Sequence, residues 1–173
     1  VDFVPLDANN ERVGKVRAYR DERTERTHEE FRSRVDDRTF FEMSGIAPAT
    51  INTANQLLAF TLEDPELAAK TDSILFLPDY FAWKLSGVKG WSRTIASTSG
   101  LCEPGSPRFN DAMFERLGLD RSWVGELNDD LTAVGQCTVE GLEQLTVVRG
   151  GAHDSACAVH GLPIDEGVRA YFL

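Results

Sequence analysis

The chain has 173 residues, of which 42% are hydrophobic and 27% are charged. This composition predicts a soluble globular fold with a core of its own, and it excludes a disordered or fibrous protein. Acidic side chains outnumber basic ones by 28 to 18, and the net charge of −10 argues against general binding to nucleic acid or to an anionic membrane.

The cysteine pattern indicates a reducing compartment, and the hydropathy indicates neither a membrane helix nor a leader. Cys102, Cys137 and Cys157 are widely spaced and include no Cys-x-x-Cys pair, so neither a zinc site nor a disulfide framework is predicted. No run approaches the ~18 apolar residues that a membrane helix needs, and no basic-then-apolar leader opens the chain. We therefore expect a cytoplasmic protein.

Both ends of the chain have the character of strands. Val1 to Leu6 is already an apolar run, and residues 169–173 stop inside another one. Natural termini tend to be polar and frayed. The sequence therefore predicts that the chain is a fragment of a longer protein.

A hairpin and a charged helix are predicted near the start. Residues 1–6 and 13–19 are expected to pair as antiparallel strands around a polar turn at residues 7–10. Charges dominate residues 24–34, with Phe31 among the few apolar anchors, which predicts an exposed helix. The apolar residues that follow lead to Gly45, which is expected to end their segment.

Helices alternate with apolar strands through the middle of the chain. Helices are predicted over residues 51–60, from Asp64 onward, over 79–87 with a stop at Gly87, and over 109–117 with a stop at Gly118. Residues 73–77 are almost purely apolar, which predicts a strand buried on both faces in the middle of a helix-covered sheet. A further strand is predicted over residues 131–139.

Two polar clusters have both a functional and an ordinary explanation. The charged run from Tyr19 to Arg23 either holds a polar ligand or lies on a solvated face, and the solvated face is the commoner outcome for such runs. Asn52, Asn55 and Gln56 place three carboxamides within five residues, and carboxamides both donate to and accept from hydroxyl groups. Such amides are as often ordinary surface residues, so they alone do not decide between a binding site and a solvated surface.

The segment from Thr146 to Gly161 combines several signals. A short β-branched run ends at Gly150-Gly151, and a helix of small residues follows. Paired glycines allow a sharp turn at the carboxyl end of a buried strand, where α/β proteins place ligands. Asp154 is expected in the first turn of the helix, where its carboxylate stays ionised. It could equally be a simple helix cap.

Short motifs occur in a set order along the chain. They are Val1-Asp2-Phe3 with Leu6-Asp7, Ala18-Tyr19-Arg20-Asp21 with Arg23-Thr24, Ser44-Gly45-Ile46, Asn52-Thr53 with Gln56-Leu57, Leu77-Pro78-Asp79-Tyr80-Phe81 with Leu85-Ser86-Gly87, and His153-Asp154-Ser155-Ala156. In this order and spacing, the chain resembles the rhamnulokinases of the FGGY carbohydrate kinase family over essentially its full length.

The resemblance implies an α/β fold of the ribonuclease-H-like (actin-like ATPase) type, incomplete, with a mixed sheet and flanking helices. Residues 1–161 would be most of the N-terminal sugar-binding domain without its first strands, and residues 162–173 would begin the C-terminal nucleotide-binding domain. The phosphate loops that such kinases carry before and after this region are missing from the chain. The isolated chain is therefore expected to be inactive.

The resemblance also assigns roles to residues. Asp154 matches the catalytic aspartate of the family, which accepts the proton of the attacking hydroxyl as general base. The residues expected to bind the sugar are His153, Ser155, Arg20, Asp21, Asn52 and Gln56. All of these except Ser155 are predicted to converge with Asp154 on one cleft outside the carboxyl ends of the strands. No metal ligand is expected among them.

The implied reaction is phosphoryl transfer from ATP, with Mg²⁺ as cofactor, to the primary hydroxyl of a ketose. The expected conversion is L-rhamnulose to L-rhamnulose 1-phosphate. The expected partners are thus the sugar and ATP, without nucleic acid or membrane, and a homodimer is left open.

Departures from the family pattern keep alternatives open. Where rhamnulokinases usually carry a Tyr-Thr-Asn-Ala step, this chain has Arg93-Thr94-Ile95-Ala96, and Asn55 replaces an aromatic residue. L-Fuculose, L-xylulose or another ketose therefore stays open as substrate. A non-catalytic sugar-binding or regulatory module on the same fold is a second alternative. A chaperone or filament protein of the actin-like ATPase type is disfavoured by the order of the motifs.

Overall fold

The structure of the protein is a computed structural model that describes residues 2–106, 108–163 and 167. Its described strands form three two-stranded sheets. The first pairs β1 (Phe3–Leu6) with β2 (Ser73–Phe76) in antiparallel orientation, with Phe3 opposite Phe76 and Leu6 opposite Ser73. Every residue of both strands is buried. The predicted burial is confirmed for residues 73–76, whereas Leu77 is half-buried and begins the next helix. The predicted place in the middle of a sheet is wrong for the described strands, because β1 is the only described partner of β2.

The predicted second strand of the N-terminal hairpin, at residues 13–19, is wrong. The chain returns past β1 only through a bridge between Leu6 and Arg12 and a hydrogen bond from Val13 N to Pro5 O. Gly14 then has a φ of 70°, which takes the backbone out of the extended conformation. The chain therefore turns away from the edge of β1 after one turn, and residues 13–19 do not extend along that edge as a strand.

Short helices follow, and local residues define both ends of the third. The charged helix predicted over residues 24–34 is present as α1 (Arg23–Arg26) and α2 (His28–Arg34), which meet at Thr27. The next helix, α3 (Asp37–Ser44), begins at Asp36, whose side chain accepts hydrogen bonds from the backbone of Arg38 and Thr39. Gly45 ends it in the left-handed conformation, as predicted.

The remaining helices of this part pack on two apolar clusters. They are α4 (Thr53–Glu63), α5 (Pro65–Lys70), α6 (Leu77–Ser86), α7 (Arg93–Ala96), α8 (Asp111–Leu117) and the 3₁₀ helix η1 (Arg121–Trp123). Helix α6 covers the smaller cluster, formed by Val4, Leu6 and Leu75, and the others surround the larger one. Phe31 of α2, Leu57 of α4 and Phe114 of α8 are among the largest fully buried side chains. Gly87 and Gly118 end α6 and α8 in the left-handed conformation, which confirms both predicted helix stops.

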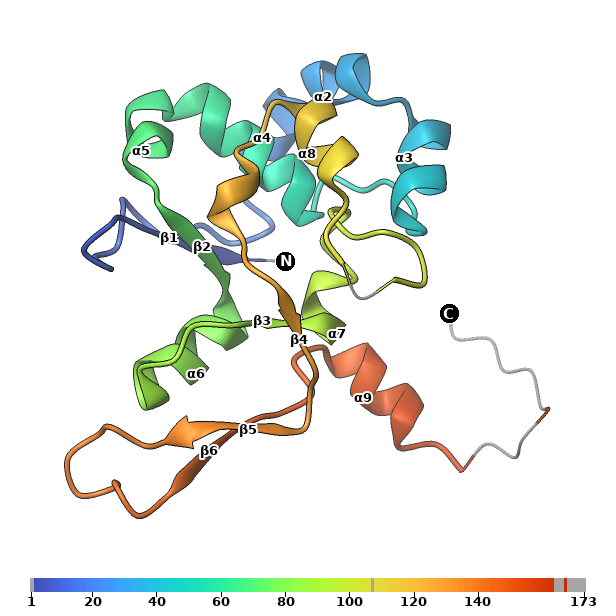
Figure 1. Cartoon of the computed structure of the whole chain (residues 1–173). Coiled ribbons are helices and arrows are strands. Elements are labelled where there is room, and N and C mark those ends of the chain that lie inside the picture. The colour runs from blue at the N-terminus through green and yellow to red at the C-terminus, as the bar shows by residue number, and fades with distance from the viewer. Residues whose placement is uncertain (1, 107, 164–166, 168–173) are drawn as a thin grey trace.

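The C-terminal part leaves this core as a hairpin and a helix. A short parallel pair, β3 (Trp91–Ser92) with β4 (Leu127–Asn128), precedes β5 (Thr132–Gln136), which pairs antiparallel with β6 (Thr146–Arg149). The last helix, α9 (Asp154–His160), follows β6 directly. Figure 1 shows the hairpin and α9 on the side of α6 and α7 that faces away from α2, α4 and α8.

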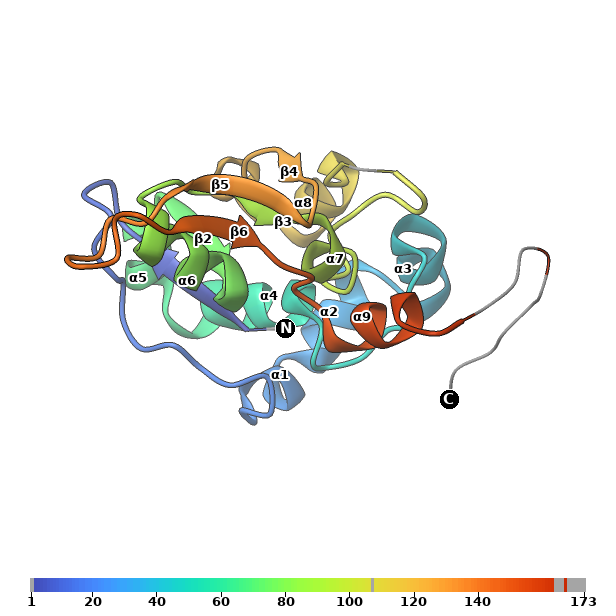
Figure 2. The same ribbon diagram turned by 90° about the horizontal axis from the view of Figure 1, so that it is seen from below.

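One expectation about β6 is corrected by the structure. The strand was expected to be buried, yet only Arg149 at its end is buried. The reason is that β6 pairs with β5 alone and packs against α6, so that much of it remains open to solvent (Figure 2). The strand predicted at residues 169–173 lies outside the described residues. None of the helices that the structure describes is long and apolar enough to cross a membrane.

Candidate functional site

Asp154 is the first residue of α9, as the sequence predicts. The residue at the cap position is His153, in an extended conformation and without a side-chain capping bond. Asp154 Oδ1 accepts a hydrogen bond of 2.7 Å from the backbone nitrogen of Ser155. The Asp154 side chain is 97% exposed. The carboxylate is thus oriented by its own helix turn and remains open to an approaching reactant.

His153 lies against the same carboxylate. Its Nε2 is 3.6 Å from Asp154 Oδ1, so the two form an ion pair when the imidazole is protonated. The imidazole is half-buried and lines a cavity, whereas the carboxylate points into solvent. This arrangement places a ring donor and a carboxylate acceptor side by side at the start of α9.

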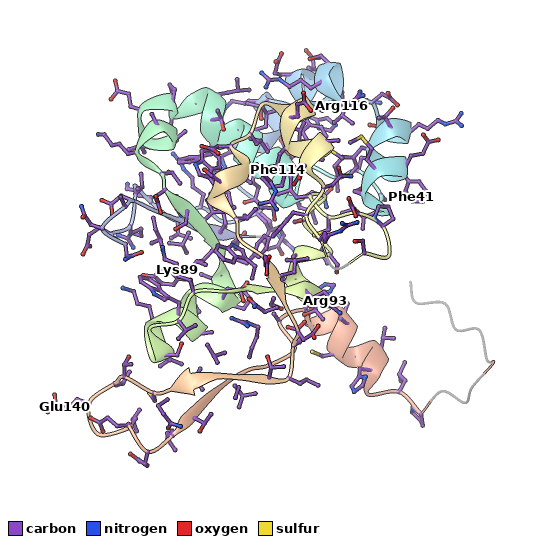
Figure 3. All side chains as sticks on the ribbon, in the orientation of Figure 1. Phe41, Lys89, Arg93, Phe114, Arg116 and Glu140 are labelled. Carbon is purple, nitrogen blue, oxygen red and sulfur yellow. The ribbon has the colours of Figure 1, made fainter. Side chains whose placement is uncertain are left out.

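A cavity of about 630 Å³ lies between α9, α7 and the loops that follow α3 and α7. His153 and Ser155 line it from α9, and Ser97, Thr98 and Arg93 line it from α7 and the turn after it. Figure 3 shows Arg93 beside the start of α9. Hydroxyl, imidazole and guanidinium groups around one opening suit a ligand that carries many hydroxyl groups.

The two departures noted in the sequence have different positions. Arg93 lines the cavity, and its Nη2 lies 2.7 Å from Asp129 Oδ1. Ile95 is a buried member of the core. Of the two, only Arg93 is therefore in a position to contact a ligand in this cavity.

The amides of α4 are buried and bonded to the backbone. Asn52 Oδ1 accepts from Ala49 N at 2.7 Å, and its Nδ2 donates to the carbonyl of Thr98 at 3.3 Å. Thr98 lines the cavity, so Asn52 contacts the cavity lining through this hydrogen bond without lining the cavity itself. Gln56 Nε2 donates to Ile51 O at 3.0 Å, and Gln56 Oε1 accepts from Arg23 at 3.4 Å. Binding of a sugar by these two amides stays a prediction.

Arg20 and Asp21 precede α1. Arg20 is exposed and lies over the ring of Tyr19, to whose hydroxyl its Nε donates at 3.0 Å. Asp21 accepts from the backbone nitrogen of Arg23, and this bond, with help from Arg17, holds the pKa of the Asp21 carboxyl below its ordinary value. Neither residue lines the cavity beside His153. Their convergence with Asp154 on one cleft stays a prediction.

A buried polar network that the sequence analysis missed lies behind β6. Asp79 of α6 is 1% exposed and Arg149 of β6 is 7% exposed, with Arg149 Nε 3.5 Å from Asp79 Oδ1. Burial raises the pKa of Asp79 to about 6, although the backbone N–H of Ser92 and the guanidinium of Arg149 act in the opposite direction. The sequence feature that could have revealed this network is an arginine at the end of a predicted strand, directly before two glycines.

The residues described by the structure include no group of three or more His, Cys, Asp or Glu side chains able to hold a metal ion. The carboxylate of Asp154 accepts from its own helix turn, whereas those of Asp79 and Asp130 both accept from Ser92.

Comparisons with known proteins agree with this architecture. Residues 1–161 match the family model described as "FGGY family of carbohydrate kinases, N-terminal domain". A xylulose kinase from Rhodospirillum rubrum is 19% identical with a TM-score of 0.77, over 87% of this chain and 32% of that one. A carbohydrate kinase from Novosphingobium aromaticivorans is 22% identical with a TM-score of 0.74, over 91% of this chain and 34% of that one.

A glycerol kinase from Plasmodium falciparum, solved with ADP, is also similar, with 16% identity and a TM-score of 0.77, over 86% of this chain and 31% of that one. At such identities the likeness shows the fold alone. It confirms the predicted α/β fold of the actin-like ATPase type. The chain spans about a third of the length of these solved structures.

Proposed function

The chain belongs to the FGGY family of carbohydrate kinases, and we propose that the whole protein transfers the γ-phosphoryl group of ATP to the primary hydroxyl of a ketose. The observation that carries the proposal is the exposed carboxylate of Asp154 at the start of α9, next to a cavity that His153 and Ser155 line. This is the place where a hydroxyl could meet an acceptor for its proton.

Asp154 acts as the general base in this proposal. A primary hydroxyl that approaches the carboxylate donates its proton to it as the oxygen attacks the phosphorus, while the protein otherwise positions the reactants. His153 and Ser155, on either side of Asp154, orient the sugar by hydrogen bonds to its other hydroxyls. Arg20, Asp21, Asn52 and Gln56 are proposed as further sugar contacts, supported by the sequence resemblance.

ATP and magnesium are proposed as the donor and its counter-ion. Magnesium supplies charge neutralisation for the phosphates when it is bound. The residues of this chain named above are proposed to act on the sugar side of the reaction. A cytoplasmic location and a homodimer also remain predictions.

L-Rhamnulose is the first substrate that we propose, because the motif series resembles the rhamnulokinases. L-Xylulose, which the sequence leaves open, is the second. Several similar solved structures are named as xylulose kinases without a stated configuration, so D-xylulose is tested beside it. Arg93 bears on the choice because it lines the cavity at a position where rhamnulokinases usually carry tyrosine. L-Fuculose completes the panel.

The test compares the whole protein with Asp154→Asn in a coupled assay of ADP release over these ketoses. The substitution keeps the shape of the side chain and removes the base, so kcat should fall roughly 10²–10⁴-fold while sugar affinity changes little. Asp111→Asn is the matched control, since Asp111 is also the first residue of a helix and is 79% exposed. Near-normal turnover by Asp154→Asn would remove Asp154 as the base.

The same assay addresses the alternative of a non-catalytic sugar-binding module. That alternative predicts binding of a ketose by the whole protein without ADP release at any enzyme concentration. The isolated chain, which spans about a third of the similar structures, should show no turnover under either proposal. Turnover by the isolated chain would contradict the expectation that it lacks the ATP-binding part.

A further inference from the structure

The turn that carries the candidate base is fixed by polar contacts on both sides. It runs from Arg149, the last residue of β6, through Gly150 and Gly151 to Ala152 and then to α9. None of the residues of α9 is buried. Apolar packing by α9 itself is therefore weak, and the position of Asp154 depends on the turn before it, which is held by the packing of Ala152 against the core and by hydrogen bonds.

On one side, the turn is held by Thr94 of α7. The backbone nitrogen of Ala152 donates to Thr94 Oγ1 at 3.2 Å, although the two residues are 58 positions apart. Ala152 is two residues before Asp154. A shift of this amide therefore moves the backbone that aims the carboxylate.

Thr94 is itself fixed by a carboxylate. Its backbone nitrogen donates to Asp130 Oδ2 at 3.0 Å, and the hydroxyl of Ser92 donates to Asp130 Oδ1. Ser92 is fully buried and its backbone nitrogen donates to both oxygens of Asp79, at 3.1 and 3.0 Å. The network thus continues to the Asp79 carboxylate.

On the other side, the turn is held through Arg149. Its guanidinium faces Asp79, and its carbonyl accepts from Leu131 N at 2.6 Å. Because Asp79 contacts both Ser92 and Arg149, the two sides of the turn meet on one buried carboxylate. Contacts from both α7 and α6 therefore hold the turn.

We propose that Thr94 is a positioning residue for Asp154. Its backbone is held by Asp130 and its hydroxyl lies 3.3 Å from that of Ser92, so that the hydroxyl fixes Ala152 and sets the direction of the carboxylate that receives the proton. The inference rests on the proposed function in that it takes Asp154 as the base. It adds a residue that would not touch the sugar or the phosphate in the reaction.

The test is a double-mutant cycle in the whole protein, with the ketose of highest turnover. Thr94→Val keeps the shape of the side chain and removes the acceptor for Ala152 N–H. Since a misplacement of about 1 Å can cost on the order of 10²-fold, we expect kcat to fall at least about tenfold with KM changed less than about twofold. Thr94→Ser, which retains the hydroxyl, should restore most of the turnover.

The cycle separates a positioning role from a general loss of structure. In the Asp154→Asn background, Thr94→Val should lower kcat by less than about twofold, because the group that Thr94 positions is already gone. Equal fold losses in both backgrounds would overturn the inference, as would a normal kcat for Thr94→Val. Thr61→Val is the control, since Thr61 donates to Leu57 O within α4, away from the turn.

A measurement that does not depend on activity keeps the two proposals apart. The amide hydrogen of Ala152 should exchange with solvent faster in Thr94→Val than in wild type, and at the wild-type rate in Thr61→Val. Unchanged exchange would overturn the hydrogen bond on which the inference rests. If exchange and kcat respond to Thr94→Val while Asp154→Asn remains active, the proposed base fails and Thr94 acts on some other group.

Asp130→Asn provides a second variant if Thr94→Val folds poorly. It keeps the size of the side chain while replacing one of the oxygens that accept from Thr94 N and Ser92 Oγ. We expect a kcat loss in the same direction as for Thr94→Val, again suppressed in the Asp154→Asn background. A kcat equal to that of wild type would count against the network as a positioning device.

Discussion

The helical body and the C-terminal arm of this chain are stabilised in different ways. In the body, from β1 to η1, side chains such as Phe31, Leu57 and Phe114 are fully buried in one apolar core. In the arm, formed by β5, β6 and α9, the buried positions are few, and α9 has none. Figure 3 shows Glu140 at the tip of the hairpin, remote from Phe114 in the core.

This difference bears on how the candidate base is held. Burial of a large apolar side chain contributes about 1.5–3 kcal/mol to the free energy of unfolding, so many such side chains stabilise the body. The arm depends instead on backbone pairing and on the network from Asp79 through Ser92 and Asp130 to Thr94. The carboxylate proposed to take part in chemistry therefore belongs to the part with the weaker apolar anchorage.

The largest expected effect is on the body. Phe114→Ala should lower the free energy of unfolding by about 3–5 kcal/mol, because it leaves a cavity in a fully packed core. Val159→Ala in α9, at a side chain that is 40% exposed, should change it by no more than about 0.5 kcal/mol. Urea unfolding of the chain, followed by circular dichroism, measures both. Similar losses for the two variants would contradict the contrast.

The second prediction concerns pH and the buried end of the network. The fold raises the pKa of Asp79 from 3.8 to about 6, mainly by burial, so the folded state holds the proton more tightly than the unfolded state does. The stability that this proton contributes is present below pH 4 and is lost as pH rises through 6. The loss amounts to roughly 3 kcal/mol, which follows from the size of the pKa change.

Asp79→Asn removes this titration. The unfolding free energy of wild type, measured relative to that of Asp79→Asn, should therefore fall as the pH is raised from 4.5 to 7.5. Urea unfolding at several pH values gives both curves. The charged groups that face Asp79 are Arg149, which favours its ionised form, and Asp130, which opposes it. Parallel curves for the two proteins would show that Asp79 does not titrate in this range.

The third prediction tests how closely Arg149 is packed. A Cβ at Gly90 would lie 2.9 Å from Cζ of Arg149 and 2.6 Å from Asn128 Oδ1, and would overlap the guanidinium. Gly90→Ala should therefore cost about 1–3 kcal/mol of stability. Gly150→Ala is the control, because a Cβ there meets nothing within 4 Å. Equal unfolding free energies for both variants would mean that Arg149 can move aside at no cost.

Features that depend on neighbouring residues could be predicted from the sequence. Gly87 and Gly118 were expected to end helices and Gly45 to end an apolar segment, and each adopts the left-handed conformation at the end of a helix. Asp154 was expected in the first turn of a helix, and it is the first residue of α9. Such features depend on a few adjacent residues, so their pattern is visible without the fold.

Features that join distant segments could not be predicted. The partner of β2 is β1, about seventy residues earlier, and the exposure of β6 follows from its single partner β5. The contacts that hold the Gly150 turn join residues from four separate parts of the chain. Hydrophobic periodicity indicates helices and strands but not which distant segments pair. The polar residues of the network gave no further signal, because each has an ordinary local explanation of its own.

The last prediction uses the cysteines as reporters of the same contrast. Cys157 is exposed on α9, whereas Cys102 is buried in the body, where burial raises the pKa of its thiol to about 12. Because the thiolate is the reacting form, Cys157 should react with iodoacetamide at pH 8 at least about 100-fold faster than Cys102. Mass spectrometry of digested samples over time gives both rates, and Cys157→Ser, which removes the fast site, is the control. Cys102 should reach the rate of an ordinary thiol only after unfolding in urea. Comparable rates in the folded chain would mean that the body opens as readily as the arm, and would remove the distinction between the two parts.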